Sequence, residues 1–143
     1  MNASSNVRNF DIANKIASTA SVFRKYFPDA RANFSPWDNC NERDWVDTID
    51  FSFHFPGWSP SIECRAILLQ LRIDNNNESG VPKLLGIVMR GMIIPKERWR
   101  VATIGEWEMT GTHLPQKEQK DNLFLVCKEL YNLFSTTASS NKS

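Results

Sequence analysis

The sequence predicts an α+β domain in which a four-stranded antiparallel sheet is flanked by an N-terminal and a C-terminal helix, in the order α-β-β-β-β-α. Apolar residues recur at helical spacing near both ends of the chain. Through the middle of the chain they alternate with polar residues, as in half-buried strands. Short turns rich in proline, glycine and asparagine separate these stretches, which favours an antiparallel meander.

Two helices frame this prediction. The first is expected from Asn9 to Tyr26, because its apolar residues recur at helical spacing and Pro28 lies where a helix cannot easily continue. The second is expected from Gln116 to Phe134, where an apolar stripe returns after a proline suited to a first helical turn. Residues 1–8 are expected to be a flexible N-terminus, residues 9–135 a single domain, and residues 136–143 a flexible tail.

Four stretches between the helices predict strands. They are residues 45–55, "SIECRAILLQLRID", "KLLGIVMRGMII" and "WRVATIGEWEM". The "PGWSP" stretch is expected to be a turn, and residues 28–44 to be a loop or a loop with one short strand. With both helices on one face, the polar positions of the strands collect on the other face of the sheet.

Composition narrows the function classes. The 143 residues suffice for one domain, and the 17 basic and 16 acidic residues leave a net charge of +1, so a nucleic-acid partner is not expected. No apolar run approaches the roughly 18 residues of a membrane span, and the N-terminus does not resemble a secretory signal, so we expect a cytoplasmic protein without a membrane partner. The three cysteines lie too far apart for a zinc motif or a disulfide framework, and no metal or cofactor is expected.

The first functional hypothesis is a non-catalytic interaction or regulatory module, which binds a protein partner or a second copy of itself through the open sheet face and loop aromatics. Trp37 and Trp58 lie in proline-bounded stretches, so their rings are expected either to cover a small core or to anchor an interface, where tryptophan is enriched. As interface anchors they are the binding candidates of this hypothesis. Arg98 and Arg100, expected on one strand face, complete the binding candidates. The sequence contains no Gly-x-Ser-x-Gly, Gly-x-Gly-x-x-Gly or phosphate-binding loop motif.

The second hypothesis is a metal-dependent nuclease or phosphodiesterase. Asp50 on one strand is followed on the next by Glu63 and Arg65, and this spacing is similar to the PD-(D/E)xK nuclease pattern, with arginine in the place of lysine. The resemblance implies that the two carboxylates hold a divalent cation, with His54 as an auxiliary base. Ser52 lies two residues from His54, too far along the strand to be assumed a partner.

The third hypothesis is a small-ligand binding protein with its pocket between the helices and the sheet, walled by phenylalanine and methionine.

Overall fold

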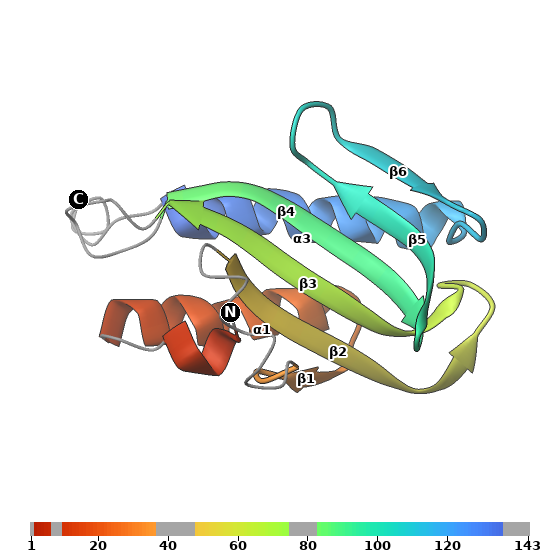
Figure 1. Cartoon of the computed structure of the whole chain (residues 1–143), viewed down its shortest axis with the longest axis horizontal. Helices are drawn as coiled ribbons and strands as arrows, with labels where there is room; N and C mark the ends of the chain where they lie inside the picture. Colours follow the sequence, from red (N-terminus) through yellow and green to blue (C-terminus); the bar gives the residue numbers. More distant parts are fainter. Residues whose placement is uncertain (1, 7–9, 37–47, 75–82, 136–143) are drawn as a thin grey trace.

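The computed structural model describes residues 2–6, 10–36, 48–74 and 83–135 of the chain. In chain order the elements are η1 (Ala3–Asn6), α1 (Phe10–Tyr26), β1 (Arg31–Asn33), β2 (Thr48–Ser59), β3 (Cys64–Asp74), β4 (Lys83–Ile93), β5 (Lys96–Ala102), β6 (Glu108–Gly111) and α3 (Lys117–Ser135). The described residues form an α+β fold, as predicted, with two α-helices and one open antiparallel sheet (Figure 1). Both α-helices lie within a residue of their predicted bounds.

Within the described ranges the sheet has six strands in the order β1-β2-β3-β4-β5-β6, and each strand pairs antiparallel with the next. The predicted meander is therefore confirmed, and the predicted number of four strands is wrong. The two additional strands lie at the edges and are short, with 3 residues in β1 and 4 in β6. Segments this short do not contain enough residues to display a period of two.

The stretch predicted as a fourth strand, residues 99–109, contributes to two strands. Between β5 and β6 the chain passes through Gly105, whose φ of 80° is a left-handed conformation that glycine adopts without steric cost. Trp107 therefore lies outside both strands. Its ring stacks on Phe124 and Tyr131 of α3, with centroids 6.2 and 5.7 Å away, and it helps to attach the end of the sheet to this helix.

β2 includes residues 56–59, the first four of the "PGWSP" stretch, which the sequence predicts as a turn. A register shift in the pairing of β2 with β3 accommodates Pro56 and Gly57, and the chain turns instead at residues 60–63. An irregularity in a ladder tolerates a proline because the missing N–H is not needed there. Trp58 thus lies on a strand and not in a loop.

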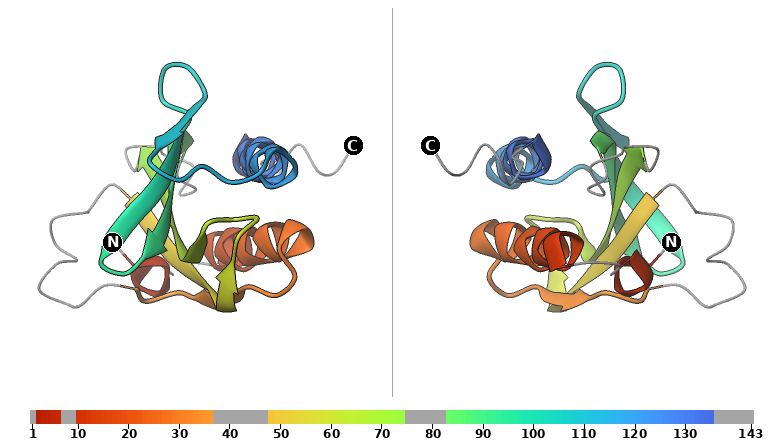
Figure 2. Two further views of the ribbon diagram at one scale, coloured as in Figure 1. Left: turned by 90° about the vertical axis from the view of Figure 1, so that its right-hand side faces the viewer. Right: turned by 90° about the vertical axis from the view of Figure 1, so that its left-hand side faces the viewer.

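Both α-helices pack on the same face of the sheet (Figure 2). Alternate strand residues and one stripe of each helix fill the space between them, and Phe23 stacks on Phe53 with ring centroids 3.9 Å apart. The core side chains include Ile12, Ile16, Phe23, Ile49, Phe51, Phe53, Ile67, Leu69, Leu71, Ile87, Met89, Trp99, Val101, Leu123, Val126 and Leu130. Side chains therefore fill the centre of the space in which the third hypothesis puts its ligand.

Glu129 joins α3 to the C-terminal end of α1. Its carboxylate accepts hydrogen bonds from the Tyr26 hydroxyl and from the Lys25 ammonium group, which lies 3.0 Å away. These hydrogen bonds, first that of Tyr26 and then that of Lys25, lower the pKa of Glu129. None of the described helices has the length and apolar character needed to cross a membrane.

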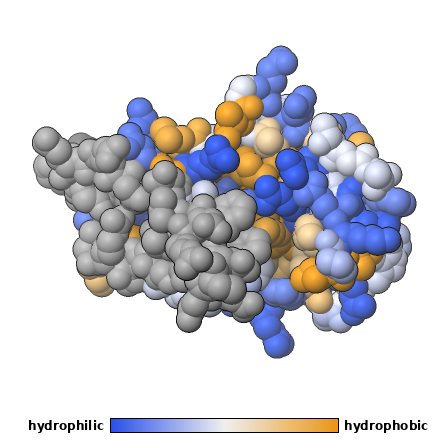
Figure 3. All heavy atoms as spheres, in the orientation of Figure 1, coloured by the Kyte–Doolittle hydropathy of each residue, from blue (hydrophilic) through white to orange (hydrophobic). Residues whose placement is uncertain are grey.

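We call the sheet face opposite the helices the open face. It faces the viewer in Figures 1 and 3 and carries both hydrophilic and hydrophobic side chains. By strand register, its residues include Thr48, Asp50, Ser52, His54, Ala66, Leu68, Gln70, Arg72, Val88, Arg90, Met92, Arg100 and Ala102.

The N-terminal segment runs beside β1 and β2. Asn2 forms an isolated parallel bridge with Asp50, the Ser4 N–H donates to the Phe34 carbonyl (2.9 Å), and Ala3 is completely buried. This is the described part of residues 1–8, for which the sequence predicts flexibility. The expected flexible tail, residues 136–143, lies outside the described residues.

Candidate functional site

A pocket of about 410 Å³ opens on the open face. Its walls come from β1 to β4 and from the turn after β4, and they are mainly apolar. The described lining residues are Asn33, Pro36, Ser52, His54, Ala66, Ile67, Leu68, Met92, Ile94 and Pro95. Ile94 stands at its rim with 71% of its surface exposed. An apolar hollow with a few polar groups is the usual form of a binding site.

Ser52 and His54 supply the polar side of this pocket. The Ser52 Oγ and the His54 Nε2 lie 3.0 Å apart, within hydrogen-bond distance. The expectation that the two groups are too far apart is therefore wrong. The side chains of residues i and i+2 point to the same side of a strand, and rotation about their side-chain bonds brings their ends together.

Beside the pocket lies a row of partly buried polar groups across β3, β4 and β5. Arg90 donates to the Gln70 Oε1 at 2.5 Å and forms an ion pair with Glu97 at 3.3 Å. Glu97 also pairs with Arg100 at 3.1 Å. Burial, followed by the nearby charge of Arg100, lowers the pKa of Arg90, while Glu97 and Asp50 act in the opposite sense.

The structure does not bring the predicted metal ligands together. Asp50 is fully buried opposite Gln70, whereas Glu63 lies in the turn before β3, about 20 Å away at the usual rise of a strand. Glu63 has a φ of 60° and pairs with Arg98, while Arg65 is exposed. The two carboxylates therefore lack the shared position that the PD-(D/E)xK resemblance implies, and the described residues contain no metal-binding group of three His, Cys, Asp or Glu.

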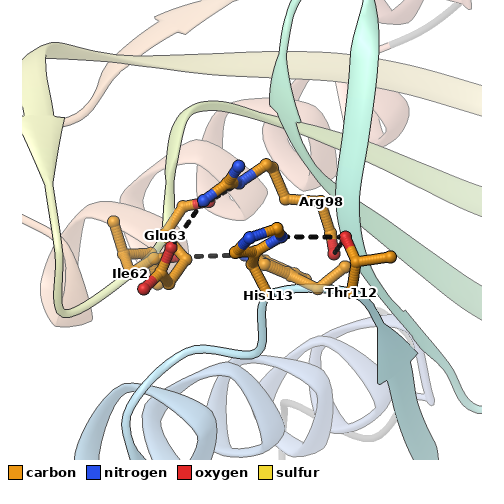
Figure 4. Close-up of polar contacts among 6 residues, drawn as sticks. Ile62, Glu63, Arg98, Thr112 and His113 are labelled. Atoms are coloured by element: carbon orange, nitrogen blue, oxygen red, sulfur yellow. Dashed lines mark hydrogen bonds and ion pairs between the residues drawn. The ribbon is translucent and has the colours of Figure 1, made fainter.

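A second cluster forms around Arg98 at the end of the sheet (Figure 4). Its guanidinium donates to the Glu63 carboxylate at 2.8 Å and to the Glu63 backbone carbonyl at 3.3 Å. The same guanidinium lies 5.2 Å from the centre of the Trp58 ring, a cation–π distance. The next residue, Trp99, is fully buried and donates its indole N–H to the Ile62 carbonyl at 2.8 Å.

The chain after β6 is tied to the same cluster. The backbone N–H groups of Thr112 and His113 donate to the Arg98 carbonyl at 3.0 and 3.2 Å. The His113 Nδ1 lies 2.9 Å from the Thr112 hydroxyl (Figure 4). Three segments that are distant in sequence thus meet at Arg98, and both its side chain and its backbone hold them.

Of the four predicted binding residues, the structure brings Trp58 and Arg98 together. Arg100 belongs to the separate row with Glu97, because a register shift in the pairing of β4 with β5 separates the directions of Arg98 and Arg100. The expectation that these two arginines share a face is therefore wrong. Trp37 lies outside the described residues.

Sequence reasoning missed the pocket walls that come from the β4–β5 turn. Met92, Ile94 and Pro95 read as the end of an apolar strand followed by a turn. The exposure of Ile94 depends on where the turn places it. The Ile-Pro pair at a strand end was the available signal, but it does not say which face the side chains reach.

Comparisons with known proteins identify the family to which this chain belongs. A family model described as a domain of unknown function matches residues 4–136, nearly the whole chain. No curated protein and no solved structure matches the chain.

Proposed function

Because the chain belongs to a family described as a domain of unknown function, we propose from its geometry that it is a non-catalytic binding module that receives a protein partner on the open face. The pocket beside Ser52 and His54 would take an apolar side chain of that partner. The observation that carries this proposal is a hollow of about 410 Å³ with apolar walls, on a face that neither of the two described α-helices covers.

The rim of the pocket supports this role. Ile94 is 71% exposed, and Met92 and Pro95 line the hollow beside it. Covering an aliphatic side chain of this size by a partner stabilises a complex by about 1.5–3 kcal/mol. The Ser52 and His54 groups and the row around Arg90 provide polar positions near the apolar centre, the usual arrangement of a protein interface.

The Ser52–His54 pair favours binding over hydrolysis. A serine nucleophile needs its histidine base held by a third group and needs donors for the developing oxyanion. Among the described residues, the His54 ring has a hydrogen bond to Ser52 and no other. The pair therefore has the composition of a polar recognition site.

A peptide-display selection tests the proposal. A library of random linear peptides is selected on the full chain and counter-selected on Ile94→Asp, which places a charge at the pocket rim. Leu125→Asp is the matched control, because Leu125 is also exposed but lies on α3, at the helix side of the molecule.

The proposal expects peptides with a shared apolar residue that bind wild type and Leu125→Asp equally and Ile94→Asp about tenfold more weakly. It further expects these peptides to shift the NMR signals of His54 and Ala66. Selected peptides that bind all three proteins alike would place the binding surface elsewhere and refute the assignment. Concentration-dependent light scattering that Ile94→Asp abolishes would identify a second copy of the chain as the partner.

A further inference from the structure

A second pocket, of about 370 Å³, lies on the other side of β2, where the end of α1, the second half of β2 and the start of α3 meet. It shares no described lining residue with the first pocket. The residues that matter for its chemistry are Tyr26, Phe27, Asp29, Phe55, Trp58 and Gln119. We infer that this pocket binds an alkylammonium group that retains at least one N–H, such as a lysine side chain or a small free amine.

Aromatic rings form the walls of this pocket. Phe27 and Phe55 meet edge to face with centroids 6.2 Å apart, and Trp58 is 46% exposed. The electron-rich face of an aromatic ring attracts a cation, and tryptophan does so most strongly. Trp58 already contacts the Arg98 guanidinium, which is not among the pocket residues, so the ring presents another part of its surface to the pocket.

Asp29 sets the sign of the charge that the pocket favours. It is the only charged residue among the described lining residues, and it forms no salt bridge in the described part of the chain. Lys25 and Arg98 are each paired, with Glu129 and Glu63 respectively. Arg24 and Arg31 line a neighbouring pocket that Asp29 also borders, and neither arginine lines this one.

The helix ends near the pocket do not alter this conclusion. α1 ends beside the pocket and α3 begins there, so they contribute partial charges of opposite sign, each of about half an elementary charge. These contributions offset one another. The carboxylate of Asp29 remains, and it favours a cation.

Gln119 adds a requirement for a donor. Its Oε1 atom is buried and has no hydrogen-bond partner among the described residues, which is costly for a carbonyl oxygen. A rotation of the Gln119 side chain that turns this oxygen toward the pocket would let an ammonium N–H satisfy it. A quaternary ammonium ion would lack the donor, and an alcohol would lack the positive charge. The aromatic walls, the carboxylate and the unpaired acceptor together define one ligand class.

NMR titration of the full chain tests this inference. The probes are n-butylammonium, tetramethylammonium and n-butanol, and the readouts are the Trp58 indole N–H and the Gln119 side-chain amide signals. The variants are Asp29→Asn and Trp58→Leu, with Glu118→Gln as the matched control. Glu118 is exposed at the start of α3, and its substitution removes the same charge outside the pocket.

We expect saturable shifts with n-butylammonium and binding of the other two probes at least about threefold weaker. Asp29→Asn and Trp58→Leu should each weaken n-butylammonium binding by about threefold or more, and Glu118→Gln should leave it unchanged. A lysine-containing tripeptide and 1,4-diaminobutane, titrated in the same way, then identify a peptide or a free amine as the tighter source of the group.

Three results would overturn the inference. The first is no saturable shift with n-butylammonium up to ~100 mM. The second is equal binding of either comparison probe, since the pocket would then recognise only apolar bulk or charge. The third is an equal effect of Asp29→Asn and Glu118→Gln. None of these outcomes bears on the open-face pocket, which Ile94→Asp tests separately.

Discussion

Substitution of Gly91 by alanine should disturb the packing of Trp99, the residue next to Arg98 in β5. Gly91 lies opposite Trp99 in the pairing of β4 with β5. A Cβ atom at this position would lie 2.1 Å from the indole Cε2 and 2.3 Å from the indole Nε1. The Trp99 ring is fully buried, and its indole N–H donates a hydrogen bond to the Ile62 carbonyl. The ring therefore cannot move away from the added methyl group without losing that hydrogen bond.

The size of the effect follows from three contributions. Overpacking of a filled core costs about 1–3 kcal/mol. Loss of the indole hydrogen bond leaves buried polar groups of Trp99 and Ile62 unpaired, at about 1–3 kcal/mol. The smaller conformational freedom of alanine in the unfolded chain offsets about 0.4–1 kcal/mol. Gly91→Ala should therefore lower the free energy of unfolding by about 3 kcal/mol, a large part of the stability of an ordinary domain.

Gly57→Ala is the matched control, because Gly57 also lies in a strand and a Cβ atom there would meet nothing within 4 Å. Urea unfolding followed by far-ultraviolet circular dichroism should give a lower midpoint for Gly91→Ala and an unchanged or higher midpoint for Gly57→Ala. In a Trp99→Leu background the cost of Gly91→Ala should largely disappear, since the clashing ring is absent. Equal midpoints for the two glycine variants would refute this explanation of Gly91.

Three further outcomes are expected. Arg98→Ala should lower the free energy of unfolding by about 1–2 kcal/mol, because it leaves the Glu63 carboxylate without its partner. Arg100→Ala should change the free energy of unfolding by less than about 0.5 kcal/mol, because Arg100 is the more exposed member of its ion pair with Glu97. Urea unfolding measures both values. Burial raises the pKa of Cys64 and Cys127 to about 12, so iodoacetamide at pH ~8 should alkylate these thiols only after unfolding, as peptide mass spectrometry would show. Because the pKa of Glu129 is lowered in the folded protein, its ionised carboxylate stabilises the fold at pH values above the unfolded-state pKa. This stabilisation is lost as the pH falls through the folded-state pKa. The difference in urea midpoint between wild type and Glu129→Gln should therefore shrink from about pH 5 to about pH 3.

The pattern of apolar residues was enough to predict the two helices and the side of β2 that faces the core. The stripe on α3 and the alternation of Ile49, Phe51 and Phe53 arise from backbone geometry alone. The same alternation placed Asp50 and His54 on the opposite side of β2, as the structure has them. These features are local, so the sequence by itself determined them.

Features that depend on pairing between distant segments were decided only in three dimensions. β1 and β6 form because a neighbouring strand provides backbone hydrogen-bond partners for a few residues. The local sequence of these short segments does not indicate this pairing. The register shifts in β2 and β5 extend one strand past a proline and turn Arg98 away from Arg100. Such irregularities redirect every side chain after them, because the side-chain period of a strand is two.

Both candidate sites depend on these pairings. The walls of the open-face pocket come from strands whose alignment sets Met92 opposite Ala66. Trp58 reaches Arg98 only because β2 continues beyond its proline. The sequence supplied the residue types, tryptophan and arginine among them. The long-range pairing of the strands determined which of those residues contact one another. Contacts between distant segments depend on the register of the strands and not on spacing along the chain.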